Sequence, residues 1–231
     1  MKLARAVSIV DRLGIALVYP IDNAPQPPSL WSAAYPRSAM AWSWNEDSDP
    51  RVAEIWHLRE RLASSSEVAY AKWFRGRATF FSLPVFHALL GRLASAGDVM
   101  VGLPHESIEL LERLREISPR STKELRAEVG LKGKSFESLF THAMKALWAR
   151  LLIVGIGEVA DGAFPSLAVS ATEMMFEDLW SGRSAVPPEA EAKLAEILER
   201  SPLFAKELAR SVKAIQEAGA LARRAFDDDE L

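Results

Sequence analysis

The sequence predicts a mainly helical α+β fold in which small β-hairpins accompany the helices. In several stretches, apolar residues recur at steps of three and four, which is typical of amphipathic helices. Short β-rich runs lie beside turn signals, which is typical of hairpin strands. In residues 119–169, a short helix, a glycine-bearing turn, a longer helix and two strand candidates follow one another. That order predicts a winged helix-turn-helix unit within a chain of two or three subdomains.

Composition limits the functions that the chain can have. With 231 residues and 49% hydrophobic content, the chain can bury a substantial core. Its formal charge of -3 argues against a polybasic binder, so any nucleic-acid contact must be local. The absence of cysteine excludes disulfides, thiol nucleophiles and Cys-ligated zinc. The four histidines show no metal-ligand spacing, so we expect neither a metal site nor a cofactor.

The N-terminus does not have the pattern of a targeting segment. Asp11 and Arg12 interrupt the first apolar run, and no small-residue cleavage site follows it. No stretch reaches the length of a membrane span. We therefore expect a cytoplasmic protein without membrane contact.

Residues 1–96 are predicted to form an N-terminal winged-helix-like unit. An amphipathic helix at 2–13 leads into a strand at 15–19, and a loop with five prolines then packs Trp31 and Tyr35 inward. Trp42 and Trp44 lie two apart, as on one face of a strand. A helix is predicted at 50–63, and an apolar run follows at 68–74. After a basic turn at 75–77, a strand is predicted at 78–82 and a second helix at 84–94.

Residues 97–183 are predicted to form the central winged helix-turn-helix. After an opening helix at 106–117, Ser121 caps a short helix, and Glu124 completes a capping box. Ser135 can cap the longer helix that follows the turn at 130–134. On that helix, apolar residues share one face, at positions 136, 139, 140, 143, 144, 147 and 148. The opposite face is polar and carries Glu137, Ser138, Thr141, His142 and Lys145.

A hairpin and a helical segment complete the chain. Strands at 151–156 and 164–169, joined by an Asp161-Gly162 turn, form the expected wing, and a helix at 172–180 follows. Residues 184–231 are expected to be helical, with helices at 189–200, 203–210 and 212–226. They form either a degenerate helix-turn-helix or a brace on the core, and the acidic residues 227–230 are expected to be a solvated end.

The charges of the central unit favour two different interpretations. Residues 119–150 hold seven Lys or Arg against three Glu, a balance of +4, which favours contact with phosphates. Residues 151–183 hold one Arg against five carboxylates, and such an acidic wing would be repelled by a duplex. A small helical subdomain without a nucleic-acid partner therefore stays open as the alternative.

Several stretches resemble a known family. They are residues 70–84 (YAKWFRGRATFFSLP), 121–126 (STKELR), Gly133-Lys134, Phe136 and the leucine-rich strand from Leu151. Over residues 31–169 the chain resembles AlkZ-related proteins of the winged helix-turn-helix superfamily that includes AlkZ-type DNA glycosylases. The resemblance implies tandem winged-helix units around a concave DNA-binding surface.

The glycosylase motif of that superfamily is missing. The resemblance implies a Gln-x-Gln or Gln-x-Asp motif on the strand after the first helix, but residues 14–20 read GIALVYP. The two glutamines of the chain, Gln26 and Gln216, lie elsewhere. Activation of water needs a carboxylate or a held polar pair, and Asp22 is the one nearby candidate.

We therefore predict a winged-helix protein that binds double-stranded DNA and lacks the recognised catalytic motif. The predicted contacts with DNA are Arg75, Arg77, Lys132, Lys134, Ser138, Thr141, His142 and Lys145. The alternatives are a base-excision glycosylase with a divergent active site and an interaction scaffold that does not bind nucleic acid.

Overall fold

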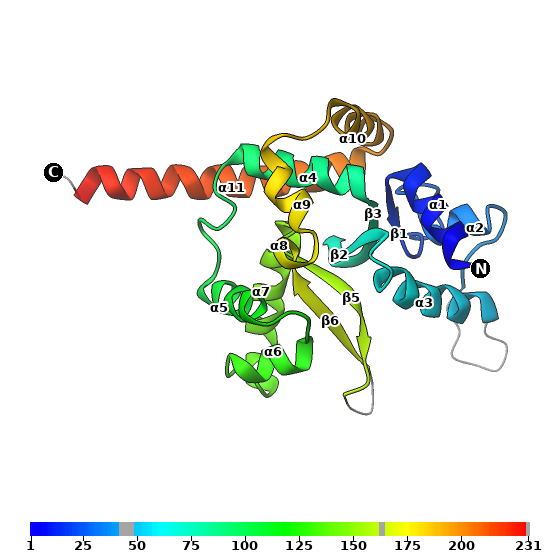
Figure 1. Cartoon of the computed structure of the whole chain (residues 1–231), viewed down its shortest axis with the longest axis horizontal. Coiled ribbons are helices and arrows are strands. Elements are labelled where there is room, and N and C mark those ends of the chain that lie inside the picture. Colours follow the sequence, from blue (N-terminus) through cyan, green and yellow to red (C-terminus); the bar gives the residue numbers. More distant parts are fainter. Residues whose placement is uncertain (42–48, 162–164, 230–231) are drawn as a thin grey trace.

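A computed structural model of the chain describes residues 1–41, 49–161 and 165–229 (Figure 1). The predicted strand position of Trp42 and Trp44, Gly162 of the predicted turn and the side chains of the acidic end lie outside this description. The described part consists mainly of helices with two small antiparallel sheets of three strands each, so the predicted mainly helical α+β class with small β-hairpins is confirmed.

Two consecutive segments have the same order of elements, and we call them the first and the second repeat. The first repeat comprises α1 (Leu3–Leu13), β1 (Ile15–Leu17), α2 (Leu30–Ala34), α3 (Pro50–Ala63), β2 (Val68–Phe74) and β3 (Arg77–Ser82). The second comprises α5 (His105–Glu116), β4 (Arg120–Ser121), α6 (Thr122–Glu128), α7 (Glu137–Ala149), β5 (Ile153–Val159) and β6 (Ser166–Ala171). The strand orders, β1-β3-β2 and β4-β6-β5, place the last strand of each repeat in the centre of its sheet.

Local signals explain where α3 and α6 begin. Asp49 caps α3 by accepting a hydrogen bond from the Arg51 amide, and Pro50 occupies the first helical position. The predicted capping box of α6 is confirmed, because Ser121 and Glu124 each accept the backbone N–H of the other.

Two predictions for helix starts were wrong. Ser135 does not cap α7, because it lies inside a 3-10 turn, η1 (Lys134–Phe136), that precedes α7. The proline-rich loop contains a helix that the sequence did not predict, α2, which Ser29 caps by accepting the Ser32 amide at 3.0 Å. Each difference concerns about one turn of helix. Helix propensity is weak over so few residues, and side-chain hydrogen bonds determine where the helix begins.

Helices outside the repeats cover one side of the molecule (Figure 1). The helix α4 (Leu83–Ala96) connects the repeats, and two helices near the C-terminus, α10 (Pro188–Arg200) and α11 (Pro202–Asp229), pack on it. The helix predicted at 172–180 is divided at Phe176 into α8 (Thr172–Met175) and α9 (Glu177–Ser181), followed by η2 (Gly182–Ser184).

The break predicted near residue 211 is absent, and α11 is one continuous helix. The buried positions Phe204, Leu208, Ser211 and Ile215 keep a spacing of three to four residues across the expected break. One straight helix can therefore bury this face along its whole length, which a turn would interrupt. The predicted degenerate helix-turn-helix does not form at this point.

The hairpin of the second repeat is packed against the first repeat. α3 and β2 both contact β5. A Cβ on Gly155 would lie 2.3 Å from the ring of Tyr70, so the backbone of β5 approaches that ring as only glycine permits. Arg59 of α3 forms an ion pair with Glu158 of β5, in which the two side chains are 5% and 14% exposed. The two repeats are thus held together by apolar contact and by a buried pair of charges.

Among the described helices, none has both the length and the apolar character needed to cross a membrane.

Candidate nucleic-acid interface

The polar face of α7 lies at the surface of the second repeat, as predicted. Ser138, His142 and Lys145 are exposed, and Thr141 is half-buried between them. Residues three and four apart lie on the same side of a helix, so these four side chains form one continuous strip. The opposite face is buried in the core through Ala143, Met144, Leu147 and Trp148.

The first turn of α7 differs from the prediction. Phe136 is 42% exposed and Leu139 is 36% exposed, although both belong to the predicted apolar face. This end of the helix is therefore less covered than the predicted apolar face requires. The end of α7 that carries the strip therefore stands away from the core.

Arg126 organises the connection between α6 and α7. Its guanidinium donates to the carbonyl oxygens of Leu131 at 2.7 Å and of Gly133 at 2.9 Å. It also pairs with Glu137 at 2.6 Å and lies 5.4 Å from the centre of the Phe140 ring. Arg126 is therefore a structural residue, which holds the loop between the two helices in one conformation.

Three further basic residues of this region also have internal partners. Arg120 pairs with Glu128 at 3.5 Å, and Lys123 donates to the backbone carbonyl of Asp161. Arg150 is 8% exposed, and its guanidinium donates to two backbone carbonyls in the α4–α5 connection, those of residues 99 and 101.

Three lysines of this region have no such internal partner. Lys132, Lys134 and Lys145 are exposed, and they form no ion pair with any residue in the described ranges. Of the seven basic residues counted in the sequence, these three are the ones without a partner among the described residues, and all of them lie beside or on α7.

The two carboxylates of the β5–β6 hairpin among the described residues, Glu158 and Asp161, both have partners within the protein. Glu158 is paired with Arg59. Asp161 accepts hydrogen bonds from Ser166 and Ser121, each at 2.7 Å, and these bonds hold the pKa of its carboxyl group below the ordinary range. Of the five acidic residues counted in the sequence, Glu158 and Glu173 form ion pairs, the latter with Arg115, and Asp161 stays ionised while serine hydroxyls hold it at the end of the hairpin.

The basic turn between β2 and β3 lies elsewhere. Arg75 and Gly76 both have positive φ, at 51° and 73°, as in the tight turns of hairpins. The Arg75 guanidinium lies 5.1 Å from the centre of the Phe74 ring, which in turn meets Phe204 at the start of α11 edge-on at 5.3 Å. Arg75 thus lies near the start of α11, whereas α6 and α10 lie on opposite sides of the molecule (Figure 1). The structure does not bring the turn together with the lysines beside α7.

The strand that would carry the glycosylase motif is buried. Ile15, Ala16 and Leu17 of β1 are at most 1% exposed and pair with β3, so β1 presents no polar side chain to a substrate. Asp22 lies after this strand, at an exposed position with φ of 50°. It is not among the residues that line the cavity described next.

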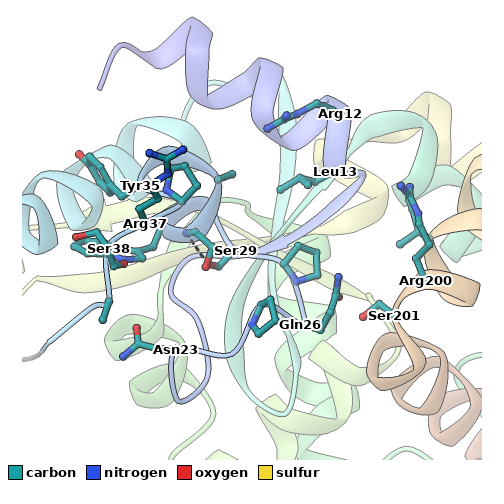
Figure 2. Close-up of a pocket in the computed structure, with 18 residues that line it drawn as sticks. Arg12, Leu13, Asn23, Gln26, Ser29, Tyr35, Arg37, Ser38, Arg200 and Ser201 are labelled. Atoms are coloured by element: carbon teal, nitrogen blue, oxygen red, sulfur yellow. Dashed lines mark hydrogen bonds between the residues drawn. The ribbon is translucent and has the colours of Figure 1, made fainter.

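A cavity of about 680 Å³ lies between α1, α2 and the α10–α11 junction (Figure 2). Its rim carries Arg12, Arg37 and Arg200, and its lining includes Gln26 and Ser201. No pattern in the sequence indicates this cavity, because its residues come from three distant segments and each arginine alone looks like an ordinary surface charge.

Comparison with known families gives one finding. The model of the family described as AlkZ related matches residues 2–215. No curated protein and no solved structure gives a significant match. The matched region covers both repeats, α4, α10 and the first half of α11. On this basis, the chain belongs to the AlkZ-related family.

Proposed function

We propose that this protein binds double-stranded DNA through the α7 strip, with the second repeat acting as a winged helix-turn-helix. The observation that carries the proposal is the set of three lysines, Lys132, Lys134 and Lys145, which are exposed and unpaired within the described part of the second repeat. The other basic residues of this region contact carboxylates or backbone carbonyls, so the lysines that are free to reach a phosphate lie on or beside one helix. The membership of the AlkZ-related family supports a role in contact with DNA.

The order of elements supports the same proposal. In the second repeat, α6 and α7 are joined by a short connection, and β5 and β6 follow as a hairpin. A recognition helix followed by a hairpin is the arrangement in which the helix enters the major groove and the hairpin lies alongside. The proposed units are residues 1–96 and 97–183, each containing one repeat, with residues 184–231 as a helical brace.

The first repeat does not offer an equivalent surface. Its counterpart of α7 is α3, which packs against β5 and places Arg59 in the buried ion pair with Glu158. One side of α3 is therefore taken up by the contact between the repeats. We propose that the second repeat makes the contact with DNA and that the first repeat holds the wing in place.

The side chains of the α7 strip suggest what they recognise. Ser138 and Thr141 can hydrogen-bond to phosphates and to several base edges alike, so they position the protein without strong discrimination. The strip contains no Arg, Asn or Gln that could make a bidentate contact with a base. We expect a weak sequence preference, with the shape and flexibility of the duplex deciding where the protein binds.

The proposal is tested by removing the three lysines together. Replacing Lys132, Lys134 and Lys145 by Ala should weaken binding to a duplex and lower the slope of log K against log salt by about one unit per lost phosphate contact. The matched control replaces Lys2, Lys206 and Lys213, three lysines on α11 or next to α1, and changes the net charge equally. Equal losses in both variants, or an unchanged slope in the first, would contradict the proposal.

Selection from a random duplex library tests the expected weak preference. A strongly enriched motif longer than a few base pairs, lost when Thr141 and His142 are changed to Ala, would show that α7 reads sequence. A library without such a motif is the expected result.

A further inference from the structure

The cavity between α1, α2 and the α10–α11 junction has the charge of an anion site. Arg12 and Arg200 stand in the last turns of α1 and α10, and Arg37 follows α2. Arg37 borders the cavity on the side opposite Arg200 (Figure 2). No aspartate or glutamate is among the described residues that line it. The cavity therefore has a positively charged lining that no described carboxylate of the lining offsets.

The arginines are available to a ligand. Arg12 and Arg37 are exposed and form no ion pair with a described residue. Arg200 pairs with Glu196 at 3.3 Å, but both side chains are more than 60% exposed, so this pair contributes little.

A buried hydroxyl without a partner points to a ligand independently of these charges. Ser201 is 2% exposed, and its Oγ has no hydrogen-bond partner among the described residues. It lines the cavity, and Figure 2 shows its hydroxyl directed toward the interior. A buried polar group that stays unsatisfied costs free energy, and most such groups in native proteins have a partner. A ligand oxygen in the cavity would supply one.

The wall beside Ser201 is held rigidly. Lys193 of α10 donates to the backbone carbonyl of Asp11 at the end of α1. Gly14, the residue after α1, has a φ of 73°. A Cβ on Gly14 would lie 2.2 Å from Cδ1 of Ile197 in α10. The end of α1 therefore touches α10 as closely as a glycine allows, which fixes Arg12 and Arg200 on one structural frame. Ser201 stands at the start of the long helix α11, whose dipole adds a partial positive charge there.

We propose that this cavity binds a phosphomonoester of about the size of a mononucleotide. Guanidinium groups match phosphate oxygens with paired hydrogen bonds, and three of them suit a dianion better than a single carboxylate. A volume of about 680 Å³ exceeds the space that inorganic phosphate needs and lies in the range of small-molecule sites. The phosphate would lie among the arginines and Ser201, and the organic part would lie toward Gln26 and the apolar lining. The ligand is either a free small molecule or the 5′-terminal phosphate of a nucleic-acid strand.

The test uses the full chain and defined probes. Calorimetric titrations with adenosine monophosphate, inorganic phosphate and adenosine should show binding of the first, weaker binding of the second and none of the third. A single-stranded oligonucleotide with a 5′-phosphate is compared with its 5′-hydroxyl twin. Preference for the phosphorylated strand over adenosine monophosphate assigns the site to a strand end, and the reverse assigns it to a free small molecule.

Variants locate the site. Arg12→Ala and Arg37→Ala should each weaken binding of the phosphorylated probe about tenfold or more, because a hydrogen bond to a charged group is lost. Arg5→Ala, an exposed arginine on α1 that does not line the cavity, is the matched control and should change nothing. Ser201→Ala should weaken binding several-fold while the Tm of the free protein stays equal or rises, because the buried hydroxyl is removed.

Three results would overturn the proposal: no binding of any phosphorylated probe, equal binding of adenosine and adenosine monophosphate, or an equal loss in Arg5→Ala. The site does not depend on the α7 strip. The variant without Lys132, Lys134 and Lys145 should keep its affinity for adenosine monophosphate, so failure of one proposal is distinguishable from failure of the other.

Discussion

Removing Glu158 tests how strongly the two repeats are joined. Arg59 is 5% exposed in its side chain and lies 4.0 Å from the centre of the Trp56 ring, so in Glu158→Ala its charge would stay buried without the carboxylate. Loss of one partner of a fully buried pair costs about 3–5 kcal/mol. Glu158 is 14% exposed, and water can reach the vacated position, so we expect a loss of about 2–3 kcal/mol in the free energy of unfolding. For a chain of this size that corresponds to a fall in Tm of about 4–12 °C.

Urea denaturation followed by tryptophan fluorescence measures the loss. The control is Glu191→Ala, which removes the exposed pair with Arg92, where the side chains are 30% and 53% exposed, and should cost less than about 1 kcal/mol. The double variant Arg59→Met with Glu158→Ala should be more stable than Glu158→Ala alone, because it no longer buries an unpaired charge. If Glu158→Ala costs no more than Glu191→Ala, or if the double variant is the less stable of the two, the reasoning is refuted.

Three further predictions follow from local geometry. Gly14→Ala should cost about 2 kcal/mol more than Gly130→Ala, measured by the same unfolding assay, because both glycines have φ near 70° but Gly130 faces open space. Hydrogen bonds from Ser166 and Ser121 lower the pKa of Asp161, so this carboxylate stabilises the fold fully above its unfolded pKa and loses that effect as pH falls through its folded pKa. An NMR titration should show the lowered value, and Ser166→Ala should raise it; an unchanged midpoint would contradict this assignment. In single-turnover assays the protein should release no methylated base above a no-enzyme control, because β1 is buried and carries no polar side chain.

The regular elements with strong local signals were predicted well. The helix predicted at residues 50–63 has these bounds in the structure, with Asp49 and Pro50 at its start. The capping box of α6 was predicted from Ser121 and Glu124 alone. Such signals act between residues three or four apart, so they can be recognised without knowledge of the tertiary fold.

The bounds of elements with weak local signals could not be predicted without the tertiary fold. The helix α2 is five residues long in a proline-rich segment, and it forms where Trp31 is buried against the first repeat. The continuity of α11 depends on a buried face that includes Ser211, a residue that sequence reasoning treats as a break. In both cases packing outweighs local propensity.

The candidate interface was predicted in part. The exposed strip of α7 follows from helical periodicity, and the structure places Ser138, His142 and Lys145 at the surface as expected. Charge counting along the chain could not show which lysines remain unpaired, because Arg126 is neutralised by Glu137 only through the loop geometry. The cavity that we propose as a phosphomonoester site had no sequence signal.

The sequence by itself determined the helical class, the hairpins, the start of α6 and the polar strip of α7, because periodicity and capping are properties of neighbouring residues. The tertiary structure decided the rest. It buried Glu158 beside Arg59, which lies 99 positions earlier in the chain, and it gathered Arg12, Arg37 and Arg200 around one cavity. Whether a charge is paired, buried or available to a ligand depends on groups that only folding brings together. The distance between two residues along the chain does not show whether they are close in the folded protein.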